Sequence, residues 1–313
     1  MVIGVAPDPV EAPAADESTA EPASPRRRVG PPAPGLLTVA LSAVMVLGTV
    51  TVFLGVFAYG LSGLQEQRSQ HQLYAQFRGL LSPSSPVAPS IGGAIPSGEP
   101  VALLDAPQAG LDNVVAVEGT SSGDLLAGPG HLGNTPLPGQ VGESVIVGKS
   151  TTAGSPFRSV TNLRRGDTVT VRTGQGDFHY VVQGRTLAGR RPPAVRSGGS
   201  ELVLVTAVGA GGTPGLDPSH LVYVDAKLEG KAVAMPRHQP RTVATSELPG
   251  HSDPGAWPLV LLWLLVLGAA TAATWWLWSR WGLLRTWLIG APVMLGILWL
   301  FSNEAMRLLP NTY

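Results

Sequence analysis

The fold is decided by residues 201–227, which read ELVLVTAVGAGGTPGLDPSHLVYVDAK. Two runs rich in β-branched residues flank a segment of Gly, Pro, Thr and Ser, so this stretch predicts two strands joined by a loop. Five further runs of this kind predict strands at 101–104, 114–117, 144–148, 167–171 and 178–183. Seven or eight short strands within residues 99–229 predict a small barrel or sandwich.

One short helix is predicted inside this mostly β region. Ser155 is expected as its N-cap and Pro156 as its first residue, because proline suits the first turn of a helix. Gly166 is expected to end it. One face of the helix is then apolar and consists of Phe157, Val160 and Leu163.

Three uncharged apolar runs lie outside the β region, at 36–64, 257–278 and 286–303. They contain 29, 22 and 18 residues, and a helix needs about 20 residues to cross the hydrocarbon core. We therefore predict one N-terminal and two C-terminal transmembrane helices. Arg26, Arg27 and Arg28 precede the first run, and Arg280 and Arg285 separate the other two. The positive-inside rule then predicts a cytoplasmic N-terminus and an extracytoplasmic barrel.

The remaining segments are interpreted as a tail and linkers. Residues 1–35 are expected to be a disordered cytoplasmic tail, 65–98 a stalk and a Pro/Ser-rich linker, 230–256 a second linker and 304–313 a short outer tail. The apolar residues of the stalk suit either the membrane surface or the barrel. In the second span, four small residues at helical spacing suit packing on the third span or on a partner subunit; they are Gly268, Ala269, Ala272 and Ala273.

Composition excludes several functions. The chain has 21 basic and 21 acidic residues, and this balance argues against a nucleic-acid binder. It has no cysteine, which excludes disulfides, thiolate metal sites and a cysteine nucleophile. His131 and His179 have no acidic residue at a metal-ligand spacing, so we expect core or surface histidines. No metal or cofactor is predicted.

An ordered set of short motifs runs through the β region. It resembles the sortase family, most closely the actinobacterial class E type. The motifs are 99–105 (EPVALLD), 117–120 (VEGT), 128–131 (GPGH), 137–139 (LPG), 144–149 (SVIVGK), 155–157 (SPF), 163–167 (LRRGD) and 202–206 (LVLVT). The resemblance implies an eight-stranded sortase β-barrel outside the membrane, in a Gram-positive cell envelope.

The resemblance also implies where catalysis would take place. Sortases join a sorting signal to a cell-wall amine with a Cys nucleophile, a His acid and an Arg that stabilises the oxyanion. The matching positions here are Lys149 for the His, Ala207 for the Cys and His220 for the Arg. An alanine methyl group cannot form an acyl-enzyme. No catalytic residue of the sortase type is therefore expected.

Other chemistry at this site is a weaker alternative. Ser150 lies next to Lys149, and a Ser–Lys pair can supply a nucleophile, although adjacent residues rarely face each other. A ligand groove or its rim is predicted to include Lys149, Ser150, Thr206, Ala207 and His220, together with a basic loop. The basic residues of that loop are Arg190, Arg191 and Arg196, and a solvated loop is the simpler interpretation of them.

Three functions follow from these observations. The first is a catalytically inactive sortase-like membrane protein, a pseudoenzyme whose barrel binds or scaffolds other cell-envelope proteins or holds an extended peptide. The second is a transpeptidase or hydrolase with a non-standard active site. The third is a subunit of an envelope secretion or transport assembly, which the absence of charge within the three runs disfavours.

Overall fold

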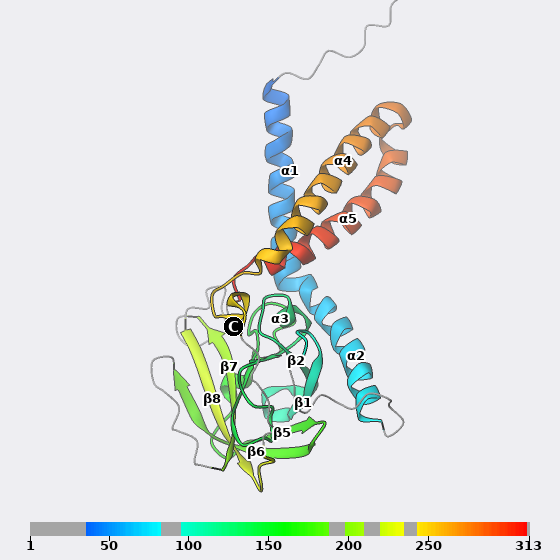
Figure 1. Ribbon diagram of the computed structural model, residues 1–313. Helices are drawn as coiled ribbons and strands as arrows, with labels where there is room; N and C mark the ends of the chain where they lie inside the picture. The colour runs from blue at the N-terminus through cyan, green and yellow to red at the C-terminus, as the bar shows by residue number, and fades with distance from the viewer. Residues whose placement is uncertain (1–35, 83–94, 188–197, 210–219, 235–242, 312–313) are drawn as a thin grey trace, which may run out of the picture. The chain divides into compact units, whose positions relative to one another are not determined.

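The computed structural model describes residues 36–82, 95–187, 198–209, 220–234 and 243–311 (Figure 1). The chain divides into two compact units, Met1–Val46 and Leu47–Tyr313. In the first unit, the described residues form the beginning of helix α1 (Leu36–Val56). The second unit holds the rest of that helix, a β-barrel and two further long helices.

Eight strands close into a barrel in the order β1-β2-β3-β4-β7-β8-β6-β5, which confirms the predicted fold. The pairs β2–β3 and β4–β7 are parallel, and the other pairs are antiparallel. The bounds are β1 (Pro100–Ala106), β2 (Leu111–Glu118), β3 (Gly130–His131), β4 (Gly142–Val147), β5 (Thr168–Thr173), β6 (Gly176–Leu187), β7 (Ser200–Val208) and β8 (His220–Glu229).

Alternation along the strands fills the barrel interior. On β7, Leu202 and Leu204 point into the main core, whereas Val203 and Val205 belong to a second cluster with Leu125 and Val147. Every residue of β7 is buried, so this strand is covered on both of its faces. The apolar run at 202–205 follows from that position, because a strand buried on both faces does not alternate.

The helix predicted from Ser155 to Gly166 is wrong. Ser155 has a φ of +54°, which an N-cap residue does not adopt. The segment instead forms successive turns, and a 3₁₀ helix covers only Val160–Asn162. The predicted apolar face is nevertheless buried in the core; it consists of Phe157, Val160 and Leu163.

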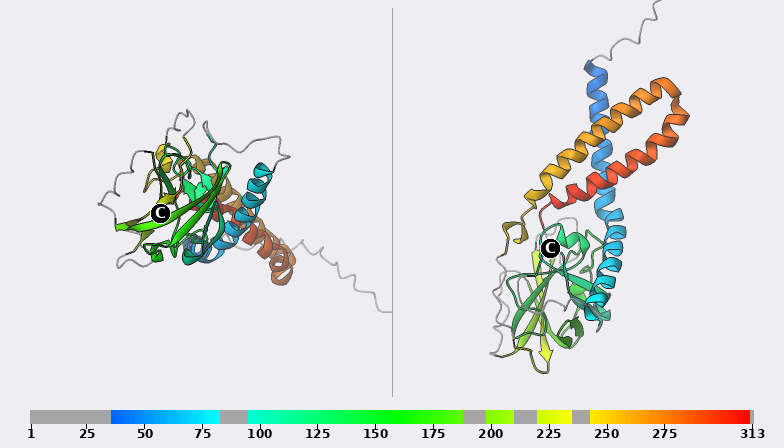
Figure 2. Two further views of the ribbon diagram at one scale, coloured as in Figure 1. Left: turned by 90° about the horizontal axis from the view of Figure 1, so that it is seen from below. Right: turned by 45° about the vertical axis from the view of Figure 1, so that its right-hand side comes forward.

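Three helices are long and apolar enough to cross a membrane, as predicted. The N-terminal one runs through α1, a π-helical turn at Phe57–Leu61 and α2 (Ser62–Leu81). The others, α4 (Trp257–Trp281) and α5 (Leu283–Arg307), form a hairpin around Gly282 (Figure 2). Phe57 packs edge-on against Trp299 with ring centroids 5.1 Å apart. The end of the N-terminal apolar helix therefore meets the end of α5.

Helix α2 is fastened to the barrel. Leu73 and Phe77 pack against Leu103, Val115 and Val117 on β1 and β2. The Gln70 side chain accepts from the Val115 N–H at 2.7 Å and donates to the Val115 carbonyl at 3.0 Å. Of the two surfaces proposed for this stalk, its apolar residues therefore cover the barrel.

The α4–α5 hairpin is also fastened to the barrel. Asn311 follows α5, is fully buried and donates from its side chain to the carbonyls of Thr120 and Ser246 at 2.9 and 3.1 Å. It also exchanges two 2.9 Å bonds with the backbone of His251, which precedes α4. Arg307 pairs with Asp253 at 2.7 Å. We call these residues, 245–253 and 307–311 with Thr120, the C-terminal clasp.

The predicted packing of the small residues of α4 on the third span is wrong. Gly268, Ala269, Ala272 and Ala273 are exposed. Helix α4 turns a different face to α5, and Thr274 lies on that face beside Gly290. A Cβ added at Gly290 would lie 3.3 Å from the methyl group of Thr274. The partner-subunit alternative for these residues stays a prediction.

Candidate functional site

Two of the three positions that match sortase catalytic residues lie together where β4 and β7 end. Val147 pairs with Val205 in the parallel ladder, and the Gly148 N–H donates to the Val205 carbonyl at 2.9 Å. Continuing this register by two residues brings Lys149 beside Ala207. Both residues are buried, at 4% and 2% exposure.

The hydroxyl groups at this site are bound to the backbone. Ser150 donates to the carbonyl of Ala207, and Thr206 donates to the carbonyl of Gly148 at 2.8 Å. A serine acts as a nucleophile only when its proton passes to a base. The Ser150 proton is engaged by a carbonyl instead, so the structure does not show a Ser150–Lys149 dyad.

Lys149 is a buried cation at this site. Burial lowers the pKa of its ammonium from 10.5 to about 8, because water stabilises the charged form better than the protein interior does. Among the residues that the structure describes, its ammonium has no hydrogen-bond or ion-pair partner. A lysine of this kind can act as an amine nucleophile or a base.

The third matching position lies on the other face of the sheet. His220 pairs with Val208, whereas Ala207 pairs with Leu221. Neighbouring residues on a strand point to opposite faces. His220 and Val208 both border a cavity that Lys149 and Ala207 do not reach. The three positions are therefore not gathered into one constellation.

The loop after Lys149 is docked on helix α2. The Ala153 N–H donates to the Ser62 hydroxyl at 3.1 Å, and Ala153 packs with Phe57 and Met306. Gly154 has a φ of +72°, and an added Cβ would lie 2.6 Å from a carboxylate oxygen of Glu66. This close approach requires glycine and fixes the loop to the helix.

The structure shows a buried, hydrogen-bonded pair of side chains that the sequence did not suggest. His131 Nδ1 lies 2.7 Å from Glu118 Oε2, and both side chains are buried. The parallel pairing of β2 with β3 places these residues side by side, so their spacing in the sequence carried no signal. His131 Nε2 lies 3.0 Å from the Pro136 carbonyl. His131 is thus one of the core histidines considered above, whereas His179 is exposed.

A group of carboxylates lies across β4, β7 and β8. Glu201 is adjacent to Glu143 in one ladder and to Lys227 in the other. Burial, followed by the nearby charges of Asp225 and Glu143, raises the pKa of Glu201 to about 7. Burial also raises the pKa of Asp225, which accepts a weak hydrogen bond from Thr186.

The remaining predicted site residues, Arg190, Arg191 and Arg196, lie outside the described residues. Within the described part of the chain, no group of three or more His, Cys, Asp or Glu residues could hold a metal ion. The expectation of no cofactor stays a prediction.

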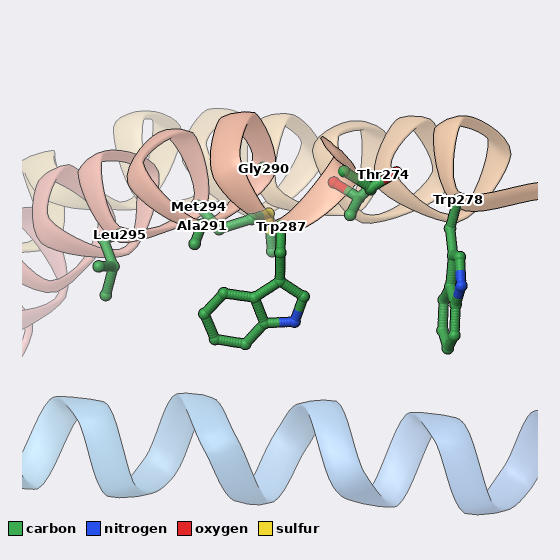
Figure 3. Close-up of a pocket in the computed structure, with 8 residues that line it drawn as sticks. Thr274, Trp278, Trp287, Gly290, Ala291, Met294 and Leu295 are labelled. Atoms are coloured by element: carbon green, nitrogen blue, oxygen red, sulfur yellow. The ribbon is translucent and has the colours of Figure 1, made fainter. Parts of the chain in front are cut away.

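An apolar cavity of about 450 Å³ lies between α4 and α5. Trp278, Trp287 and Leu295 project from the same side of this helix pair (Figure 3). The hydroxyls of Thr274 and Thr286 donate to carbonyls of their own helices at 2.8 and 2.9 Å. The lining of the cavity is therefore mostly apolar.

The sequence of the barrel matches a known protein family. Residues 104–215 match the family model of the sortase domain. Sortase E from Streptomyces avermitilis is 30% identical over 44% of this chain and 91% of its own, with a TM-score of 0.37. A Clostridium perfringens sortase D5 transpeptidase is 21% identical over 52% and 99% of the two chains, with a TM-score of 0.42. Among curated proteins none matches.

The family match lies within the closed barrel, from the end of β1 to beyond β7. It leaves the three long apolar helices outside the matched segment. This chain therefore carries a sortase domain and, in that domain, belongs to the sortase family.

Proposed function

We propose that this chain is a non-catalytic sortase-like membrane protein whose barrel binds other proteins of the cell envelope. The observation that carries the proposal is the position that matches the sortase nucleophile. It holds Ala207, and the chain has no cysteine that could replace it. The hydroxyl of Ser150 is bound to the Ala207 carbonyl. The fold is thus retained without the group that forms an acyl-enzyme.

The proposed location is the outer face of the membrane. The N-terminal apolar helix and α5 meet at the barrel through Phe57 and Trp299. The turn of the hairpin, with Arg280 and Arg285, lies at the opposite end of α5. Positive charge is enriched on the cytoplasmic side of membrane helices. This supports a cytoplasmic N-terminus, three crossings and an extracytoplasmic barrel.

Site-specific photocrosslinking in the native membrane tests the binding role. A photoreactive amino acid replaces Leu187, which is exposed at 58% beside a barrel cavity. The matched control replaces Gln108, which is exposed on the 3₁₀ turn between β1 and β2. We expect one or a few envelope proteins to be crosslinked at Leu187 in stoichiometric amounts, and not at Gln108. Absence of adducts at both positions would contradict the binding role.

A catalytic role is the second candidate, and the lowered pKa of Lys149 favours it. A neutral amine in a buried site can attack a peptide carbonyl. The carbonyl carbon then bonds to the Lys149 nitrogen, the peptide C–N bond breaks, and the C-terminal fragment leaves as an amine that takes up the proton lost by Lys149. Incubation of the full-length protein with a sorting-signal-like peptide, followed by mass spectrometry, tests this candidate. A peptide adduct on Lys149 that the Lys149→Arg variant lacks, together with release of the C-terminal fragment, would contradict the non-catalytic role.

A further inference from the structure

The end of the barrel contains a second cavity, on the opposite face of β7 from Ala207. Its volume is about 410 Å³, within the range of small-ligand pockets of about 300–1,000 Å³. Its lining combines two cationic or titratable side chains with apolar ones. The lining residues are Thr161, Arg185, Leu187, Val208, Gly209, His220 and Val222.

A bulge in β6 turns Arg185 toward this cavity. Val182 pairs with Ala226, but Gly184 pairs with Asp225, so Gln183 is an extra residue in the ladder. An extra residue reverses which face the following side chains occupy. Arg185 consequently pairs with the core residue Val224. Without the bulge, this guanidinium would lie on the outer face.

The Arg185 guanidinium has donors to spare. Its Nη1 donates to the Thr161 carbonyl at 2.7 Å, which fixes the position of the side chain. No carboxylate pairs with it in the part of the chain that the structure describes. Asp225, the nearest acid on β8, lies on the opposite face, where Thr186 donates to it.

The apolar lining restricts what kind of anion fits. Leu187, Val208 and Val222 form aliphatic walls, and His220 lies at the beginning of β8 among them. A guanidinium binds a carboxylate through two parallel N–H···O bonds. A ligand with a carboxylate beside a small aliphatic side chain satisfies both parts of this lining.

We propose that this cavity binds the free C-terminal carboxylate of an extended peptide whose last side chain is aliphatic. The carboxylate contacts Arg185, with His220 next to it, and the side chain contacts Leu187, Val208 and Val222. The proposal rests on the binding role proposed above and gives that role a ligand class. It concerns a different face of β7 from the positions that match the catalytic residues.

Saturation-transfer NMR with the full-length protein in lipid nanodiscs tests the proposal. The probes are N-acetyl-alanyl-valine as the free acid and the same dipeptide as its C-terminal amide. A hydrogen bond to a charged group is worth enough to change a Kd about tenfold or more. We expect the acid to bind at least about tenfold more tightly than the amide, and Arg185→Gln to abolish the difference.

Three controls separate binding from folding. Arg172→Gln removes an exposed arginine that pairs with Asp177, and it should leave both Kd values unchanged. Arg185→Lys keeps the charge and should retain a preference for the acid. Thermal unfolding shows whether each variant is folded. If Arg185→Gln does not fold, His220→Gln takes its place as the test variant and should weaken binding of the acid.

The results also separate this inference from the binding role. Equal affinity for acid and amide in the wild type would overturn the carboxylate site, as would failure of both probes to bind. Envelope proteins crosslinked at Leu187 would keep the binding role even then. Absence of crosslinks together with a preference for the acid would overturn the role in protein binding and retain the carboxylate site.

Discussion

Replacing Lys149 by methionine should stabilise the barrel at neutral pH. The lysine is 4% exposed, and burial lowers the pKa of its ammonium from 10.5 to about 8. Each pH unit of this difference is worth about 1.4 kcal/mol, so keeping the charge at pH 7 costs the fold about 3 kcal/mol. Methionine has a similar length and carries no charge. We therefore expect the unfolding free energy at pH 7 to rise by up to about 3 kcal/mol.

The pH dependence of the unfolding free energy provides a second, independent test. Between pH 8 and 10.5 the lysine is neutral in the folded state and protonated in the unfolded state. The unfolded state then binds more protons, so the unfolding free energy of the wild type rises with pH. From pH 7 to 9.5 the contribution of Lys149 is about 2 kcal/mol. In the Lys149→Met variant this contribution is lost.

The assay must report on the barrel and not on the helices. All eight tryptophans lie between Trp257 and Trp299, so tryptophan fluorescence follows the C-terminal hairpin. Pulse proteolysis in urea, with the full-length protein in nanodiscs, measures unfolding of the barrel by loss of the intact band. Lys231→Met is the matched control, because Lys231 is an exposed lysine just after β8.

The test compares the unfolding free energy of the wild type and of the variant, and how each depends on pH. Lys231→Met should keep the stability and pH dependence of the wild type. Equal pH dependence in the wild type and the Lys149→Met variant would refute the reasoning, because the buried ammonium would then not be its source. A variant less stable than the wild type at pH 7 would show that Lys149 has a compensating partner.

Three further predictions concern other parts of the chain. A cysteine introduced by Ala207→Cys is the only thiol in that variant, and position 207 is buried. Because it reacts only after local opening, it should react with iodoacetamide at least about a hundredfold more slowly than the exposed cysteine of the Gln108→Cys variant. Equal reaction rates would show an open site. Asn311→Ala removes buried hydrogen bonds of the clasp and should destabilise it by about 2 kcal/mol, which hydrogen exchange of residues 245–253 measures; unchanged exchange would contradict the clasp. Glu201 has a raised pKa of about 7, so the folded protein binds one more proton than the unfolded protein, and its stability falls as the pH rises from 4.5 through 7. Glu201→Gln should reduce this fall and stabilise the protein at pH 8, with little effect at pH 4. Urea unfolding that shows the same pH dependence in both proteins would contradict the assignment.

The sequence predicts the barrel well because its long strands carry strong local signals. The runs at 201–208 and 221–227 are rich in β-branched residues, and β7 and β8 include them. Strand β3 has only two residues, too few for any periodic pattern. Ser155 and Pro156 match a helix start, but Ser155 has a positive φ. The loop that precedes it is docked on α2, and no local pattern records such a contact.

The sites depend on pairings between distant residues. The Glu118–His131 pair forms because β2 and β3 are parallel neighbours. Arg185 borders the cavity only because of the register shift after Val182, and alternation along the sequence assumes that no such shift occurs. Lys149 and Ala207 could be singled out from the family resemblance, but the burial of Lys149 required the structure.

The C-terminal clasp has a mechanical consequence. A barrel that was attached through a single flexible linker would rotate freely, and a tensile force on the barrel would reach only one helix. Here α2 holds one side through Gln70, and the clasp holds another through Asn311 and Arg307. A tensile load on a protein bound to the barrel is therefore shared between the N-terminal helix and the hairpin. It must shear several hydrogen bonds together before either attachment extends.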